Sequence, residues 1–179
     1  MSASSIIVDA RSFGAQLPRH FSALQRATQD GEGKHELLVV DDTRERRLAR
    51  LASRFDVTLV PCRRCPLGER LNVAVAASQG ELLFFHGPVL RGLHPWLDNQ
   101  VSSLGRQEWD VAVLRARGQG VLLRLLSRLH RASPADTFCV TRGWFDRIGG
   151  FDPVLEHQAL PELIERLRLC QARISIEGP

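Results

Sequence analysis

Short apolar segments alternate along this chain with segments in which apolar residues recur every three or four positions. The first pattern predicts strands, and the second predicts helices that bury one face. The predicted strands are residues 5–10, 36–41, 56–61, 81–86, 110–116 and 137–141, with a weaker one in ARISI at 172–176. Strands alternating with helices predict an α/β fold, with a mostly parallel central sheet flanked by helices.

The predicted helices each place their apolar residues on one face. These faces comprise Leu17, Phe21 and Leu24; Leu48, Leu51 and Phe55; Leu71, Val75 and Ser78; and Leu160, Leu163, Ile164 and Leu167. Further helices are predicted over 95–104 and 119–131. Asp41, Asp42 and Thr43 are three possible N-cap residues in a row, so the second helix is expected to begin directly after them.

The pattern is not interrupted by a repeat, a low-complexity tract or a long linker. A chain of 179 residues is long enough for one domain with a full-sized core, so we expect a single domain over residues 1–179. No segment approaches the roughly 18 uncharged apolar residues that span a bilayer, and no basic region precedes an apolar run at the start. We therefore expect a cytoplasmic protein without a transmembrane segment.

The net charge of +4 raises the question of nucleic-acid binding. All but one of the 24 basic residues are arginines, and they are scattered along the chain rather than clustered. With 6% aromatic residues and no tyrosine, stacking platforms for single strands are also scarce. The composition therefore argues against a nucleic-acid partner.

Two of the four cysteines form a C-x-x-C motif, Cys62 and Cys65. A structural zinc site needs about four ligands, and no second C-x-x-C or histidine pair supplies the rest. Pro66 and Gly68 predict a loop here rather than the helix start that a redox motif requires. Two reduced loop thiols are the expected state.

Ligands bind to open parallel sheets beyond the carboxyl ends of the strands, so the residues that follow each strand are candidates for a binding site. At these positions stand Asp9 and Arg11, Asp41 and Asp42, the loop from Pro61 through the cysteines, and His86.

Four segments resemble the family 2 glycosyltransferases, whose nucleotide-sugar domain has the GT-A fold. They are SIIVDARSFGAQLPRHFSAL, ELLVVDDT, PLGERLNVAVAASQGELLFFH and FCVTRGWFDRIGGFDPVL. WFDRIGGFDP is the most specific of these matches, and Gly149 and Gly150 in it suit the left-handed turn at a helix end. The resemblance implies a nucleotide-diphospho-sugar transferase-like fold of the GT-A type.

The resemblance also implies roles for particular residues. Asp41 in VVDD would accept hydrogen bonds from the nucleotide base or ribose. Arg70 and Asn72 in GERLN would open a helix beneath the nucleotide, with the Arg70 guanidinium donating to a diphosphate. A solvated helix face is the alternative for Arg70. The other ligand-binding residues expected at this edge are Asp9, Arg11, Asp42 and His86.

The metal motif of the family is altered in this chain. Family 2 enzymes end their fourth strand with Asp-x-Asp or His-Ala-Asp, whose last carboxylate holds a divalent metal on the diphosphate. This chain has His86, Gly87 and Pro88, and proline offers no side-chain ligand to Mg²⁺ or Mn²⁺. We predict an incomplete metal site with His86 as the remaining ligand, and a site shifted onto His86, Glu156 and His157 stays open.

The general base of the family is altered as well. Ala159 and Leu160 align with the Glu-Asp pair that contains this base, and neither can take a proton. Glu156 and His157 lie nearby in the sequence and are the candidate catalytic replacements. The alternative is that both are solvated loop residues.

These changes leave two hypotheses for function. The favoured one is a catalytically impaired glycosyltransferase family 2-like protein, whose nucleotide-sugar-type pocket serves binding or regulation with a nucleotide-diphosphate sugar or a protein as partner. The alternative is an active inverting glycosyltransferase with a non-standard metal site and base, which would use Mg²⁺ or Mn²⁺. Loss of both metal and base removes two large contributions to catalysis, which favours the first.

Overall fold

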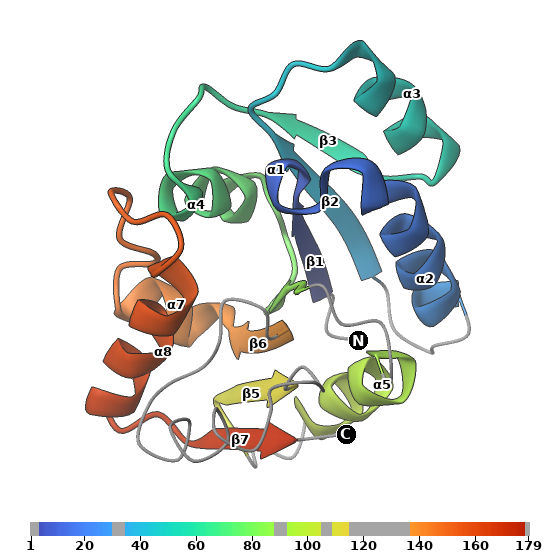
Figure 1. Cartoon of the computed structure of the whole chain (residues 1–179). Helices are drawn as coiled ribbons and strands as arrows, with labels where there is room; N and C mark the ends of the chain where they lie inside the picture. Colours follow the sequence, from blue (N-terminus) through green and yellow to red (C-terminus); the bar gives the residue numbers. More distant parts are fainter. Residues whose placement is uncertain (1–3, 30–34, 88–92, 105–108, 115–136, 178–179) are drawn as a thin grey trace, which may run out of the picture.

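The chain folds around one seven-stranded sheet in a computed structural model that describes residues 4–29, 35–87, 93–104, 109–114 and 137–177 (Figure 1). The strands are β1 (Ser4–Asp9), β2 (His35–Asp41), β3 (Thr58–Pro61), β4 (Leu82–Phe85), β5 (Val111–Leu114), β6 (Thr137–Thr141) and β7 (Ile174–Glu177), in the order β3-β2-β1-β4-β6-β5-β7. Only β6 is antiparallel to its neighbours, β4 and β5. The predicted α/β class with a mostly parallel sheet is confirmed.

Helices cover both faces of this sheet. They are α1 (Ala10–Phe13), α2 (Leu17–Gln29), α3 (Arg46–Arg54), α4 (Leu67–Ala77), α5 (Leu93–Leu104), α7 (Arg142–Arg147) and α8 (Ala159–Leu169), with a 3₁₀ turn, η1, at Gly14–Gln16. Helices α2, α3 and α5 pack on one face, and α4, α7 and α8 on the other (Figure 1). The predicted helix over 119–131 lies outside the described residues.

Two hydrophobic cores result, one on each face, because successive strand residues point to opposite sides. In β1, Ile6 and Val8 join the core beneath α2, whereas Ile7 joins the core beneath α4. In β4, Phe84 faces the first core and Phe85 the second. Strands with both faces buried read as continuous apolar runs, which is why the sequence pattern located them well.

The predicted start of the second helix is wrong. Helix α3 begins at Arg46, two residues later than expected, and its N-cap residue Glu45 makes no side-chain cap hydrogen bond. The Asp41 side chain instead bonds Thr43, and the Asp42 side chain bonds Arg11. None of the three predicted cap residues directly precedes α3, so none occupies its N-cap position.

The predicted glycine turn is confirmed. Gly149 and Gly150 have φ angles of 80° and 71°, in the left-handed region, directly after α7. A Cβ on Gly150 would also lie 2.9 Å from Asn72 Oδ1, so this position has no room for a side chain.

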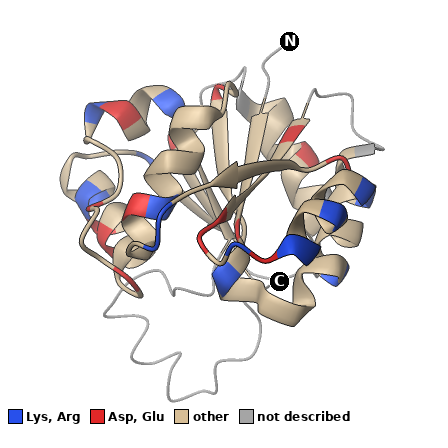
Figure 2. Cartoon of the chain, turned by 90° about the horizontal axis from the view of Figure 1, so that it is seen from above, with Lys and Arg blue, Asp and Glu red and all other residues tan. Residues whose placement is uncertain are grey.

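The surface carries charges of both signs. Seen from above, the described Lys and Arg positions are interspersed with Asp and Glu positions along the ribbon (Figure 2). Within the described residues, none of the helices is both long enough and apolar enough to cross a membrane.

Candidate functional site at the carboxyl edge of the sheet

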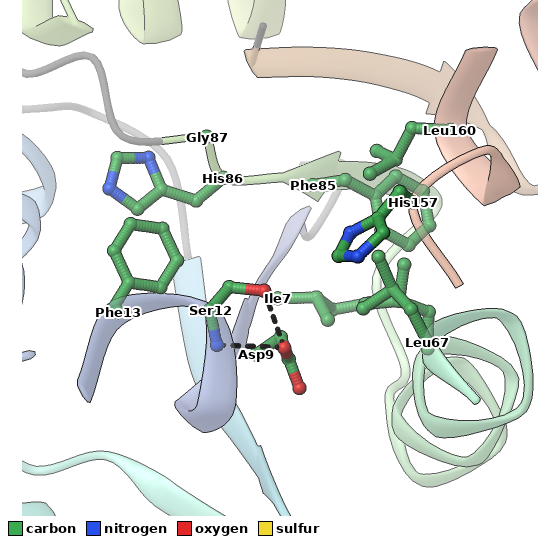
Figure 3. Close-up of a pocket in the computed structure, with 11 residues that line it drawn as sticks. Ile7, Asp9, Ser12, Phe13, Leu67, Phe85, His86, Gly87, His157 and Leu160 are labelled. Atoms are coloured by element: carbon green, nitrogen blue, oxygen red, sulfur yellow. Dashed lines mark hydrogen bonds between the residues drawn. The ribbon is translucent and has the colours of Figure 1, made fainter. Parts of the chain in front are cut away.

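The strand order reverses direction at β1, which makes the edge between β1 and β4 the expected place for a ligand. A pocket of about 260 Å³ opens there (Figure 3). Its wall consists of Ile7, Asp9, Ser12, Phe13, Leu67, Leu71, Phe85, His86, Gly87, His157 and Leu160. The pocket thus joins the ends of β1 and β4 to the start of α4 and the turn before α8.

Arg70 lies in α4 beside this pocket and is the largest fully buried side chain, with 1% of its surface exposed. Its Nε donates to Asp9 Oδ1 at 2.8 Å, its Nη1 to the Cys65 carbonyl at 2.6 Å, and its Nη2 to Glu156 Oε1 at 3.1 Å. Burial acts to lower the pKa of Arg70, but the bonds with Asp9 and Glu156 outweigh it and raise the pKa. The solvated helix face considered for Arg70 is therefore wrong.

The aspartates at the strand ends are bonded within the protein. Asp9 accepts from Arg70 and also from the backbone N of Ser12 at 3.0 Å, which caps α1. Asp42 forms an ion pair with Arg11, and its Oδ2 lies 3.6 Å from Arg70 Nη1. The sequence predicted that Asp9, Arg11, Asp42 and Arg70 are ligand-binding residues of one site. The structure places the four side chains together at this edge, where they are paired with each other.

Glu156 comes from the turn before α8 and connects it to α4. Its Oε2 accepts from the Leu67 backbone N at 3.0 Å, while its Oε1 accepts from Arg70. Partial burial acts to raise the pKa of Glu156, but Arg70 and the Leu67 amide lower it overall. A lowered pKa makes a weak base, so the geometry gives Glu156 a bonding role within the fold.

His157 lines the pocket from the other side and is exposed (Figure 3). Its ring makes no hydrogen bond or ion pair with the described part of the chain. Of the two candidate bases, it is the one whose nitrogens are available to a ligand.

Asn72 follows Arg70 on α4 and bonds the chain just beyond the glycine turn. Its Nδ2 donates to the Phe151 carbonyl at 2.8 Å, and its Oδ1 accepts from the Phe151 backbone N at 3.0 Å. Nearby, Gly68 N donates to the Leu155 carbonyl at 2.9 Å. We call this contact between Gly68, Arg70 and Asn72 of α4 and residues 150–156 the clasp.

His86, at the end of β4, is almost completely buried and contacts a second histidine. Its Nε2 lies 2.9 Å from Nδ1 of His20 in α2, and the Phe13 ring stacks on it with centroids 5.4 Å apart. Its Nδ1 has no hydrogen-bond partner in the part of the chain that the structure describes. Sequence reasoning missed His20, because a single histidine between Leu17 and Phe21 carries no signal beyond that of a core position.

The residues at this edge do not fit the divalent metal that the glycosyltransferase resemblance implies. Within the described segments, no three His, Cys, Asp or Glu side chains gather as ligands for one ion. Mg²⁺ and Mn²⁺ prefer carboxylate oxygens, and those of Asp9, Asp42 and Glu156 are bonded to arginines instead. Pro88 lies outside the described residues, and a metal role for His86 stays a prediction.

A second hollow, a groove of about 750 Å³, lies beyond the ends of β2 and β3. Asp41 lines it, with its Oδ1 accepting from Thr43 N at 2.7 Å. Cys62 and Cys65 line it too and are free thiols in the predicted loop. Burial raises the pKa of Cys62 to about 12 and also raises that of Cys65, so both thiols stay protonated at neutral pH.

Comparison with solved structures identifies the fold. The mannosyltransferase PcManGT of Pyrobaculum calidifontis, determined with GDP-Man and Mn²⁺, matches with a TM-score of 0.72 and 17% identity over 98% of this chain and 54% of its own. Glucosyl-3-phosphoglycerate synthase of Mycobacterium tuberculosis matches with a TM-score of 0.72 and 17% identity over 99% of this chain and 70% of its own. For S. aureus TarS the TM-score is 0.67, with 17% identity over 99% of this chain and 58% of its own.

The chain has a glycosyltransferase fold of the GT-A type. The resemblance stated from the sequence and the fold class it implied are confirmed. No protein-family model and no curated protein matches the sequence. The chain spans between 54% and 70% of the length of the three structures named above. At 17% identity, these matches define the architecture of this glycosyltransferase-like chain and not its reaction.

Proposed function

We propose that this glycosyltransferase-like chain binds a nucleotide-sugar-type ligand at the carboxyl edge of its sheet without metal-dependent glycosyl transfer, and acts in binding or regulation. The observation that carries the proposal is the pairing of the acidic side chains at this edge. Asp9 and Glu156 are bonded to Arg70, and Asp42 is bonded to Arg11. Carboxylates bonded to arginines are poor metal ligands and poor bases.

Glycosyl transfer depends on stabilisation of the leaving diphosphate and on a general base, so a chain that lacks both loses much of its catalysis. A leaving diphosphate develops negative charge, and its stabilisation by a metal or by fixed cations contributes several kcal/mol to catalysis. Arg70 and Arg11 are both engaged with carboxylates, and neither lines the pocket. A missing general base removes a further factor of roughly 10²–10⁴.

An active inverting glycosyltransferase is the second candidate, and the position of His157 favours it. This exposed histidine lines the pocket next to Leu160, close in sequence to the place where the family has its base. In this alternative, His157 takes the proton from the acceptor hydroxyl. Solved structures of similar fold contain GDP-Man or UDP together with Mn²⁺, which makes a nucleotide sugar the donor to test.

The deciding experiment is calorimetric titration of UDP, GDP and their sugars, with and without Mn²⁺, together with an assay for release of the nucleoside diphosphate. We expect weak binding that is the same with and without Mn²⁺, and no release. Tight binding that requires Mn²⁺, or turnover that His157→Gln abolishes, would establish the active enzyme instead. If none of these nucleotides binds, the nucleotide pocket is refuted.

Asp41 offers a specific test of the nucleotide position. We expect Asp41→Ala to abolish nucleotide binding while lowering the free energy of unfolding by only about 1 kcal/mol, because only its bonds to Thr43 are lost. Asp146→Ala, which alters an exposed carboxylate on α7, is the matched control and should bind like the wild type. Unchanged affinity in Asp41→Ala would show that the nucleotide lies elsewhere.

A further inference from the structure

Three carboxylates from three separate segments converge on one guanidinium. Asp9 ends β1, Asp42 follows β2, and Glu156 belongs to the turn before α8. Arg70 Nε and Nη2 lie 2.8 and 3.2 Å from the two Asp9 oxygens, and Nη2 lies 3.1 Å from Glu156 Oε1. Nη1 lies 3.6 Å from Asp42 Oδ2, so every nitrogen of the guanidinium faces an acid.

Such a cluster is strongly destabilised without a cation at its centre. Like charges at these distances repel strongly where water is excluded, and the side chains of Asp9, Asp42 and Arg70 are at most 5% exposed. Arg11 pairs with the same Asp42 oxygen, Oδ2, that faces Arg70. Three carboxylates therefore meet two guanidiniums, and Arg70 is the one that contacts all three.

We propose that Arg70 is the resident counter-ion of this carboxylate cluster and keeps divalent cations out of the carboxyl edge of the sheet. Removal of the guanidinium would expose a latent divalent-cation site made of Asp9, Asp42 and Glu156. The proposal also gives the reason why any ligand at this edge binds without a metal, a part that rests on the function proposed above.

The arrangement around Arg70 supports this role. The acids are spread along the edge of a planar group, and in the described part of the chain no three His, Cys, Asp or Glu side chains are gathered to hold one ion. Asp42 Oδ1 is buried and has no hydrogen-bond partner among the described residues, so one carboxylate oxygen remains available. Divalent cations such as Mn²⁺ and Ca²⁺ take oxygen ligands and complete their shells with water, which the space left by a guanidinium would admit.

The test is the variant Arg70→Met, which keeps an unbranched side chain and removes the charge. Thermal unfolding is followed by circular dichroism in EDTA and then with Mn²⁺ or Ca²⁺ rising to about 10 mM, because an ion that binds only the folded state raises the melting temperature with its concentration. We expect the melting temperature of Arg70→Met to rise with either ion. That of the wild type should stay constant, and calorimetry should give one ion per Arg70→Met chain.

Two further variants separate this role from a structural one. Arg142→Met removes an arginine whose bonds within the described segments all go to neutral oxygens, the Gly80 and Val75 carbonyls and Ser78 Oγ. It should lose stability without gaining a response to either ion. Asp9→Asn added to Arg70→Met should weaken the response at least about tenfold, because one charged ligand is removed.

Several results would overturn the proposal. One is a wild type that Mn²⁺ stabilises as much as the variant, and another is an Arg70→Met protein whose melting temperature ignores both ions. If Arg70→Met is unfolded in EDTA, refolding on addition of Mn²⁺ supports the proposal, and failure to refold counts against it. These titrations contain no nucleotide, so a wild type that binds no nucleotide refutes the proposed function and leaves this result standing.

Discussion

The imidazole of His86 is buried, and a second proton on its Nδ1 would have no hydrogen-bond acceptor among the described residues. Its Nε2 shares one hydrogen with His20 Nδ1, so the ring that accepts this hydrogen is neutral and the pair cannot carry a proton on both of these nitrogens. Burial, and after it the charge on His20, lowers the pKa of His86 to about 3. Burial and Arg19 lower the pKa of His20 as well. Protonation of either ring therefore favours the unfolded chain.

We expect acid to destabilise the protein through this pair. Between about pH 3 and 6.5 the unfolded chain binds a proton at His86 that the folded chain excludes, so the free energy of unfolding falls as the pH drops. Protonation of His86 lowers the free energy of unfolding by at most about 1.4 kcal/mol per pH unit. Urea denaturation at about pH 7 and about pH 5 measures it.

The variants His86→Gln and His157→Gln identify the source of this pH dependence. His86→Gln should lose less stability between the two pH values than the wild type, because a glutamine does not titrate. His157→Gln changes an exposed ring and should behave like the wild type. An equal loss in the wild type and His86→Gln would mean that other groups, such as the carboxylates, account for the pH dependence.

At the scale of single residues, the sequence indicated the edge but not the bonds made there. Asp9, Arg11 and Asp42 follow strands, and that rule alone brings them together. That Glu156 bonds Arg70, 86 positions away, depends on how the turn before α8 packs on α4, and no local pattern encodes it. The sequence therefore named Arg70 and Glu156 as site residues without revealing that they are each other's partners.

The elements of the clasp meet at a distance that only glycine permits. A Cβ on Gly68 would lie 2.0 Å from the Asp152 carbonyl oxygen, a backbone atom that cannot move aside freely. The same close approach lets Gly68 N reach the Leu155 carbonyl, while Glu156 accepts from Leu67 N. The turn thus satisfies the first two amides of α4, whose N-cap residue Pro66 makes no side-chain cap hydrogen bond.

We expect Gly68→Ala to destabilise the protein by about 1–3 kcal/mol, because the clash outweighs the better helix propensity of alanine. Gly143→Ala in α7 is the matched control, since a Cβ there meets no atom within 4 Å. It should leave stability unchanged or raise it by up to about 1 kcal/mol. Urea denaturation of both variants measures the difference, and equal effects would show that α4 does not depend on this close approach.

At the scale of elements, periodicity predicted most of the fold. The strand predicted over 137–141 coincides with β6, and the weaker segment at the end of the chain forms β7 two residues later than expected. The error at α3 has a different origin. Asp41 and Asp42 are bonded to Thr43 and Arg11, and two further residues follow Thr43 before the helix begins at Arg46. Periodicity locates an element by its buried face, whereas its first residue depends on tertiary bonds.

At the scale of the whole molecule, the two cores share one sheet. Trp96 contacts Phe84 in the core beneath α2 and α5, and Trp144 packs against the core on the other face. Loss of packing on one face would expose strands that also support the other face. We therefore expect both cores to unfold in one transition.

Single-tryptophan variants test this cooperativity. Trp109→Phe with Trp144→Phe leaves Trp96 as the reporter of one face, and Trp96→Phe with Trp109→Phe leaves Trp144 as the reporter of the other. In each variant, the urea midpoint from fluorescence should equal that from circular dichroism. A fluorescence midpoint below the circular dichroism midpoint in either variant would reveal a face that unfolds on its own.

The clasp has a consequence for how chains of this kind are grouped. The segments GERLN and GGFDP, which carry much of the likeness to glycosyltransferases, bond each other through Asn72 and Phe151. These bonds stabilise the scaffold whether or not the chain turns over a substrate. A likeness concentrated in such segments therefore reports the fold, and the reaction has to be judged from the side chains that remain unbonded at the strand ends.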